Sequence, residues 1–109
     1  MSTKVINIAD DFSTKPYGRY PEDGDFNGER FRNEFLIPAI RDNEKVIVDL
    51  DGTRGYGSSF LDEAFGGLIR ESVFSFDEVK RKLEIKSKFE SYIEEITSYI
   101  QEANDNLSG

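Results

Sequence analysis

Two residue types that do much of the chemistry in proteins are missing, because the 109-residue chain has no cysteine and no histidine. Without cysteine, disulfides and thiolate metal sites are excluded, and a reducing cytoplasm is compatible with the chain. Without histidine, the chain lacks the usual general base, every Ser-His triad and imidazole-bound zinc. We therefore expect no cofactor, no metal centre of these kinds and no catalytic residue.

Long apolar runs and an excess of basic residues are missing too. No stretch approaches the ~18 apolar residues of a membrane-spanning helix, and the first residues lack the apolar region of a signal peptide. The 22 acidic residues outnumber the 14 basic ones, and the net charge of −8 opposes binding to a phosphate backbone. We expect a cytoplasmic protein that binds neither nucleic acid nor membrane.

What is present is enough for one small folded domain. Hydrophobic residues make up 37% and aromatic residues 13% of the chain, a composition typical of a globular protein. A chain of this length supports one core and leaves no room for a second. We predict a single domain over residues 1–109, with disordered ends at 1–3 and 105–109.

The clearest pattern lies in residues 45–70. The β-branched run 46–48 predicts a buried central strand. Asp49 and Asp51 follow this run, and Asp51 forms a typical turn pair with Gly52. Ligands and partners of open α/β sheets bind outside the carboxyl ends of the strands, so we expect a site at this edge.

A helix is predicted after the turn. Its apolar residues recur at helical spacing and form a stripe wide enough to face a sheet: Phe60, Leu61, Ala64, Phe65, Leu68 and Ile69. Ser58 or Ser59 is the expected N-cap, and Asp62 and Glu63 lie in the first turn, where the helix dipole favours negative charge. The pair Gly66-Gly67 costs about 1 kcal/mol per glycine against alanine, so we expect a compensating close approach, to the sheet or to a partner.

Strands and helices alternate along the rest of the chain. Residues 4–8 and 83–87 alternate apolar and polar side chains as strands do, and 17–20 is a candidate short strand or hairpin arm within a Gly- and Pro-rich loop. Helices between strands require crossover connections. We predict an α/β fold with a mixed or mostly parallel sheet of about four strands packed by helices.

Three further helices are predicted. Asn27 caps a helix over residues 28–40, which Pro38 should kink or end. Ser75 caps a short helix through Arg81. An amphipathic helix follows residue 88, and its apolar residues are Phe89, Ile93, Ile96, Ile100 and Ala103. The residues from Asn104 onward are expected to fray.

Three blocks of the chain resemble the STAS-like domain family of unknown function, a bacterial and phage group: residues 12–40, 46–70 and 83–87. The second block, VIVDLDGTRGYGSSFLDEAFGGLIR, is the specific one, because its glycines, its two serines and its FGGLIR ending occur together. The family is similar in layout to anti-sigma factor antagonist (STAS) domains, small α/β folds that bind a GHKL-type kinase or anti-sigma partner. The resemblance implies such a fold and a partner of that class.

In the antagonist domains, the partner phosphorylates a serine at the start of the helix after the central strand. Their motif Asp-Ser-Ser-Gly-Leu-Gly places its two serines on Ser58 and Ser59, with Ser59 in the phosphorylated position. The chain has Gly57 where the antagonists have the aspartate, and Phe60 and Asp62 where they have glycines. The resemblance therefore implies phosphorylation at Ser59, with Ser58 beside it.

An enzymatic alternative stays open at the end of the central strand. Residues 46–53, VIVDLDGT, match the motif of haloacid dehalogenase-type phosphatases, in which the first aspartate attacks phosphorus and the second is the acid/base. This match would assign Asp49 and Asp51 to an Mg²⁺-dependent phosphatase-like activity, or to a weak metal site. The chain offers one predicted strand after the motif and no acidic strand end there, so the constellation is incomplete.

A third interpretation is anion or nucleotide sensing. Four arginines near the helix start could hold an anion: Arg19, Arg30, Arg32 and Arg54. With 22 acidic residues in the chain, salt bridges are the simpler expectation for them.

Taken together, these patterns favour a non-enzymatic protein-interaction or regulatory module that docks its partner through residues 52–59 and the following helix. The tyrosines at positions 17, 20 and 56 are expected in exposed loops, where interfaces are rich in tyrosine. The chain is expected to be a monomer or a homodimer, because the C-terminal apolar stripe fits a core or a dimer seam. The predicted partner-binding residues are Arg54, Tyr56, Gly57, Ser58, Ser59 and Asp62.

Overall fold

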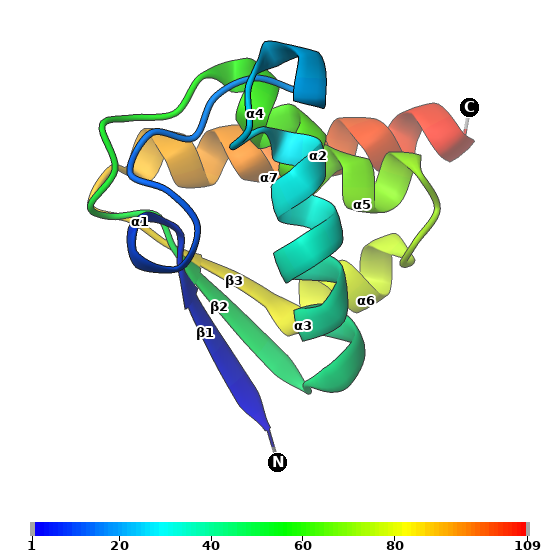
Figure 1. Cartoon of the computed structure of the whole chain (residues 1–109). Helices are drawn as coiled ribbons and strands as arrows, with labels where there is room; N and C mark the ends of the chain where they lie inside the picture. Colours follow the sequence, from blue (N-terminus) through cyan, green and yellow to red (C-terminus); the bar gives the residue numbers. More distant parts are fainter. Residues whose placement is uncertain (1, 109) are drawn as a thin grey trace.

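The computed structural model describes residues 2–108, so the predictions for Met1 and Gly109 lie outside it. The described residues contain one parallel sheet of three strands, in this order: β1 (Thr3–Asn7), β2 (Lys45–Asp49) and β3 (Leu83–Lys86) (Figure 1). The predicted α/β fold is confirmed, and the predicted central strand is the middle one.

The candidate strand at residues 17–20 is wrong. The backbone N–H groups of Arg19 and Tyr20 both donate to the carboxylate of Asp23, at 2.9 and 3.2 Å, and fold the segment into a turn. The Gly18 carbonyl accepts a hydrogen bond from Gly28 N–H at 2.9 Å, so this segment bonds to a helix start and not to the sheet. The described sheet therefore has three strands where the sequence predicts about four.

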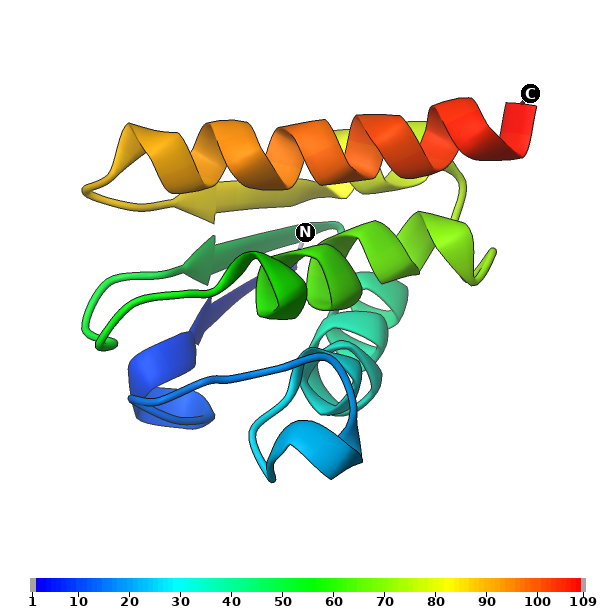
Figure 2. The same cartoon turned by 90° about the horizontal axis from the view of Figure 1, so that it is seen from above.

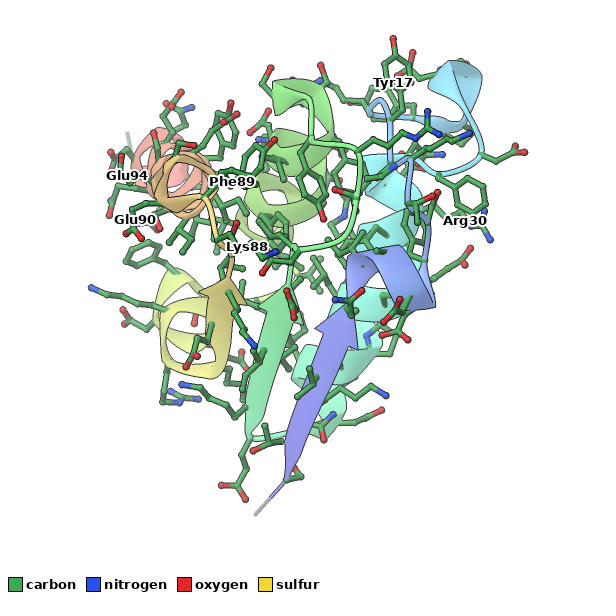
Figure 3. The ribbon with its side chains drawn as sticks, turned by 90° about the vertical axis from the view of Figure 1, so that its left-hand side faces the viewer. Tyr17, Arg30, Lys88, Phe89, Glu90 and Glu94 are labelled. Atoms are coloured by element: carbon green, nitrogen blue, oxygen red, sulfur yellow. The ribbon has the colours of Figure 1, made fainter. Side chains whose placement is uncertain are left out.

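Helices cover one face of this sheet. Ile6, Val46 and Val48 point to the covered face and are at most 2% exposed. Val5 and Ile47 pair in the register on the opposite face, where Val5 is 56% exposed. No helix lies over β1 and β2 on that side in Figure 3. Parallel sheets usually have both faces covered, so the bare face is a departure from the common pattern.

The short helical elements between β1 and β2 are α1 (Ile8–Asp11), η1 (Pro21–Asp23), α2 (Gly28–Phe31), η2 (Arg32–Leu36) and α3 (Ile37–Asp42). After β2 come four further short elements, α4 (Ser58–Leu61), η3 (Asp62–Gly66), α5 (Gly67–Arg70) and α6 (Phe76–Lys82), and the long helix α7 (Glu90–Ser108). α7 lies alongside α5 and η3 and covers them from outside (Figure 2). Helix continues through Ser108, where the sequence predicts a frayed end.

Two of these helices are interrupted by a wider π turn. The first bulged helix, residues 28–42, joins α2, η2 and α3; the second bulged helix, residues 58–70, joins α4, η3 and α5. In the first, Ile37 N–H donates to the carbonyl of Arg32 five residues back. Pro38 follows this wide turn, which moves the preceding carbonyls away from the proline ring, so the helix continues beyond Pro38 instead of ending there.

Most of the other local predictions are confirmed. Asn27 caps the first bulged helix by accepting from Arg30 N–H at 2.8 Å, and Ser75 caps α6 by accepting from Glu78 N–H at 3.1 Å. The stripe predicted for the second bulged helix is buried throughout, at 0 to 2% exposure. This helix is therefore the centre of the core, between the first bulged helix and α7.

Candidate functional site

A cleft of about 390 Å³ lies at the carboxyl edge of the sheet. We call it the strand-end cleft. One wall is the turn after β2, and the other is the start of α7, where Lys88 and Phe89 stand beside the turn (Figure 3). Its lining residues are Leu50, Asp51, Gly52, Thr53, Arg54, Gly55, Tyr56, Lys88, Phe89 and Tyr92. The sheet edge where the sequence predicts a site is therefore hollowed.

The two aspartates at this edge hold backbone groups. The Asp49 carboxylate accepts from Asp51 N–H at 3.0 Å, and the Asp51 carboxylate accepts from Lys88 N–H at 2.9 Å. The second Asp49 oxygen lies 4.0 Å from the Lys86 ammonium. Within residues 2–108, no group of three or more acidic side chains is placed to hold a metal ion. The observed role of these aspartates is to tie the turn to the start of α7.

Tyr56 is packed, contrary to its predicted exposure. Its hydroxyl donates to the Leu50 carbonyl at 2.6 Å, and its ring meets the Tyr92 ring edge-on at 5.2 Å between centroids. Its backbone N–H donates to the Tyr92 hydroxyl at 3.3 Å. Burial raises the pKa of Tyr56 from 10.0 to about 12. Tyr17 and Tyr20, at 68% and 42%, are exposed as predicted.

The predicted serine N-cap is also wrong. Gly57 is the N-cap of the second bulged helix, and no side chain caps this helix end. Ser58 and Ser59 are its first two helical residues, and both are exposed. The serine side chains therefore do not satisfy the helix N-terminus. Arg54 is exposed as well and forms no ion pair with another described residue.

Asp62 and Glu63 form ion pairs with arginines and are not simply exposed charges at the helix start. Arg32 Nη1 lies 2.6 Å from Glu63 Oε2 and also donates to the Glu63 carbonyl at 2.6 Å. The Arg32 and Glu63 side chains are 6% and 5% exposed. Arg19 and Arg70 bind Asp62 at 2.7 and 3.1 Å, and each lies 3.5 Å from Glu63. We call these five residues the buried ion cluster.

Most of the arginines that could hold an anion are paired with carboxylates, in this cluster or on the surface. The hydrogen bond with Asp62 raises the pKa of Arg19. Arg30 pairs with Glu34 at 3.2 Å on the surface of the first bulged helix. Arg19, Arg30 and Arg32 are therefore neutralised by carboxylates, and the structure does not bring them together with Arg54 around a common anion position.

The glycine pair in the second bulged helix makes room for this cluster. A Cβ on Gly67 would overlap the guanidinium of Arg32. A Cβ on Gly66 would lie 2.8 Å from a carboxylate oxygen of Asp62 and 3.4 Å from the Tyr99 carbonyl in α7. The predicted close approach is therefore real, but it is an approach to Arg32 and α7, and not to the sheet.

The family follows from a comparison with known sequences. The model of one family, described as STAS-like domain of unknown function (DUF4325), matches residues 27–91, which is more than half of the chain. The chain belongs to this family. No curated protein and no solved structure matches it.

In this STAS-like domain the matched residues hold most of the features described above. They include the turn after β2, both exposed serines and four members of the buried ion cluster. Arg19 and the whole of β1 lie outside the match. Among the described residues, no helix combines the length and the apolar character that a bilayer-spanning segment needs.

Sequence reasoning missed one wall of the strand-end cleft of this STAS-like domain. Lys88, Phe89 and Tyr92 line it, and none of them was singled out as a site residue. Phe89 was placed in the apolar stripe of the last helix, but the helix begins at Glu90 and Phe89 is 61% exposed. The available signal was Ser87, whose hydroxyl accepts from Phe89 N–H at 3.0 Å and marks a turn before the helix.

Proposed function

We propose that this STAS-like domain is a non-enzymatic interaction module of the bacterial or phage cytoplasm that docks a protein partner, a GHKL-type ATPase or kinase. The docking area is the rim of the strand-end cleft, which we call the strand-end surface. Its exposed members are Gly52, Arg54, Lys88 and Phe89 from the cleft lining, extended along the chain by Gly57, Ser58 and Ser59. The class of the partner rests on the family resemblance, and the location rests on the geometry.

The observation that carries the location is the exposure of Phe89. Its ring is 61% exposed, yet it is held against the edge of the Tyr92 ring at 5.9 Å between centroids. An aromatic side chain in this position costs a partner little ordering entropy when it is buried, and such residues often dominate binding energy. The bonds from Asp51 and Tyr56 keep the surrounding turn in place.

Only the first helical turn of the second bulged helix belongs to this surface. Residues 63–69 are all buried beneath the first bulged helix and α7. Asp62 already binds Arg19 and Arg70. The partner we propose therefore contacts Ser58 and Ser59 and does not lie along the helix, which narrows the docking area expected from the sequence.

Serine phosphorylation would act on this same surface. Ser58 and Ser59 are exposed, so both hydroxyls are accessible to a kinase. A phosphate adds about −2 charge at pH 7 and would sit one helical turn from Asp62. We propose that this charge at Ser59, and secondarily at Ser58, regulates docking by changing the electrostatics of the strand-end surface.

The test is direct binding. Proteins encoded by neighbouring genes, GHKL-type ATPases among them, are purified and titrated with the wild-type domain by calorimetry. Phe89→Ala and Ser59→Glu are expected to weaken binding about tenfold or more, as hot-spot truncation and buried charge do. Leu107→Ala is the matched control, because Leu107 is 56% exposed at the other end of α7. If the wild type and the three variants bind with equal affinity, the strand-end surface is not the docking site. If no GHKL-type ATPase binds, the proposed class of partner is wrong.

A separate assay addresses catalysis. Phosphate release from aryl phosphates with Mg²⁺ is measured for the wild type and for Asp49→Asn. The proposal expects no turnover above buffer in either protein. Turnover that disappears in Asp49→Asn would identify a nucleophile and would contradict a non-enzymatic role.

A further inference from the structure

The outer edge of β1 is open. The sheet order places β1 at one side, and no described strand lies beyond it (Figure 3). Ser2 to Val5 are all exposed. Strand edges with unpaired backbone groups accept an added strand, and proteins usually cover or blunt them for that reason.

The backbone groups that face outward can be assigned from the hydrogen bonds. The Ser2 carbonyl accepts from Lys45 N–H at 3.2 Å, so residue 2 faces β2. Because directions alternate along a strand, residues 4 and 6 also face β2, and residues 3, 5 and 7 face outward. Asn7 N–H confirms this, since it donates at 2.9 Å to the side chain of Asp11 and not to the sheet. Thr3 and Val5 are left with outward N–H and C=O groups.

A groove of about 480 Å³ adjoins this edge on the side covered by helices. It lies between β1 and the first bulged helix, where the side chains of an added strand would point. Its apolar lining comes from Ile6, Phe35, Pro38 and Ala39. Its charged lining consists of one cation and three carboxylates: Lys4, Asp11, Glu34 and Asp42.

These charges decide which occupant fits. Arg30 pairs with Glu34, so the groove keeps an excess of one negative charge, and Asp42 has no ion pair among the described residues. A second copy of this chain, with its net charge of −8, would bring further carboxylates to the same place. A segment with apolar residues and a Lys or Arg at every second position, so that all of them point into the groove, would fill the apolar floor and neutralise the rim.

We propose that β1 and this groove bind an extended, basic segment of another protein as an added β-strand. Main-chain hydrogen bonds to Thr3 and Val5 provide the pairing, apolar side chains enter beside Phe35 and Pro38, and a Lys or Arg meets Asp42. This surface lies apart from the strand-end surface and does not depend on the docking proposed there.

The probe is a display library of random ten-residue peptides, panned on the wild-type chain at 0.15 M salt to limit non-specific attraction. Val5→Pro serves for counter-selection, because it removes only an outward N–H and leaves the ladder to β2 intact. Thr3→Pro is the second variant of the same kind, should Val5→Pro fold poorly. Enriched peptides are expected to carry apolar residues and a Lys or Arg at every second position, on the face that points into the groove, and to bind the proline variant about tenfold more weakly.

Two readouts separate strand addition from simple charge attraction. Hydrogen exchange at Thr3 and Val5 is expected to slow when an enriched peptide is bound. Asp42→Asn is expected to weaken binding about two- to fivefold, whereas Asp77→Asn, the same charge change on α6, leaves it unchanged.

Several results would overturn the proposal: no enrichment, binding to the proline variants as tight as to the wild type, or equal effects of the two Asp→Asn changes. Concentration-dependent protection of Thr3 and Val5 in the wild-type chain alone would also overturn it, because the occupant would then be a second copy.

Discussion

Two pairs of acidic residues, Asp49 with Asp51 and Asp62 with Glu63, differ in burial and in the groups that their carboxylates bind. The first pair lies in a motif-like strand end and resembles catalytic carboxylates, yet it holds backbone N–H groups near the surface. The second pair resembles ordinary first-turn helix residues, yet it binds three arginines, and its pair Arg32–Glu63 is buried in the interior. Burial and partners, rather than neighbours in the sequence, set the energetic importance of a carboxylate.

The difference has an energetic basis. A carboxylate at the surface exchanges water for one hydrogen bond, and the net gain is small. A buried carboxylate loses its hydration and remains tolerable only while its cation is in place. The interior pair should therefore be the sensitive one, and the following variants test this contrast from the largest expected effect to the smallest.

Removal of Glu63 should have the largest effect. Glu63→Ala leaves the Arg32 guanidinium buried without its carboxylate, and we expect a loss of about 3–5 kcal/mol in the free energy of unfolding. Urea denaturation followed by circular dichroism measures it. The double variant Arg32→Met with Glu63→Leu is the control, because an apolar pair should recover most of the loss. A loss below about 1 kcal/mol in Glu63→Ala would contradict this contrast, because the interior pair would then stabilise the fold no more than a surface pair does.

Filling the space beside Arg32 should come next. Gly67→Ala forces the Arg32 guanidinium to move, and we expect a loss of about 1–3 kcal/mol in unfolding free energy. Gly66→Ala is the matched control, because its nearest atoms are ends of side chains that can shift, and a gain of about 1 kcal/mol in helix propensity offsets that movement. If the two alanines cost the same in urea denaturation, the packing explanation of the glycine pair fails.

At the strand end, the shape of the side chain should matter more than its charge. Asp51→Ala loses the acceptor for Lys88 N–H and should cost about 1–2 kcal/mol. Asp51→Asn keeps an oxygen in the same place and should cost about 0.5 kcal/mol or less. Thermal unfolding of the three proteins compares them. An Asn variant as unstable as the Ala variant would show that the charge itself is needed.

The last prediction is a pH dependence of the strand-end turn, which has no effect at neutral pH and appears only in alkaline solution. The folded pKa of Tyr56 is about 12 against an ordinary 10.0, because burial disfavours its ionised form. The unfolded chain therefore releases this proton first, so the stability that neutral Tyr56 provides is complete below pH 10 and declines between pH 10 and 12. Unfolding free energies over that range should fall less steeply in Tyr56→Phe. If the unfolding free energies of the wild type and Tyr56→Phe fall equally steeply with pH, this pH dependence does not come from Tyr56.

Much of the fold can be predicted from the sequence, because the decisive patterns are local. The β-branched run of β2 and the apolar stripe of the second bulged helix each have a clear period, and both elements form as predicted. The caps Asn27 and Ser75 also depend only on the next three residues. The segment at 17–20 was misassigned because the carboxylate of Asp23 satisfies backbone groups that a strand would have offered to a neighbour.

The candidate site was only partly predictable. Its position at the end of β2 follows from the chain order, but its second wall depends on where α7 begins, and Phe89 fits the helical period whether or not it is inside the helix. The buried ion cluster could not be foreseen, since Arg32 and Glu63 are 31 residues apart and meet only when two helices pack together. The sequence favours Ser58 or Ser59 as the N-cap because serine is common at that position, whereas the structure has Gly57 there.

The π turns also make the two bulged helices sensitive to insertion. Each turn already accommodates one residue more than a regular α-helix would at that point. Deleting a residue between 62 and 66 would restore regular winding and leave the orientation of the following residues nearly unchanged, whereas inserting one would rotate everything after it by about 100° around the helix axis. After such an insertion Leu68 and Ile69 would leave the core, and Gly67 would no longer lie beneath Arg32. Insertions in these segments therefore cost more than most single substitutions, whereas the irregular segment 13–20 carries no such register.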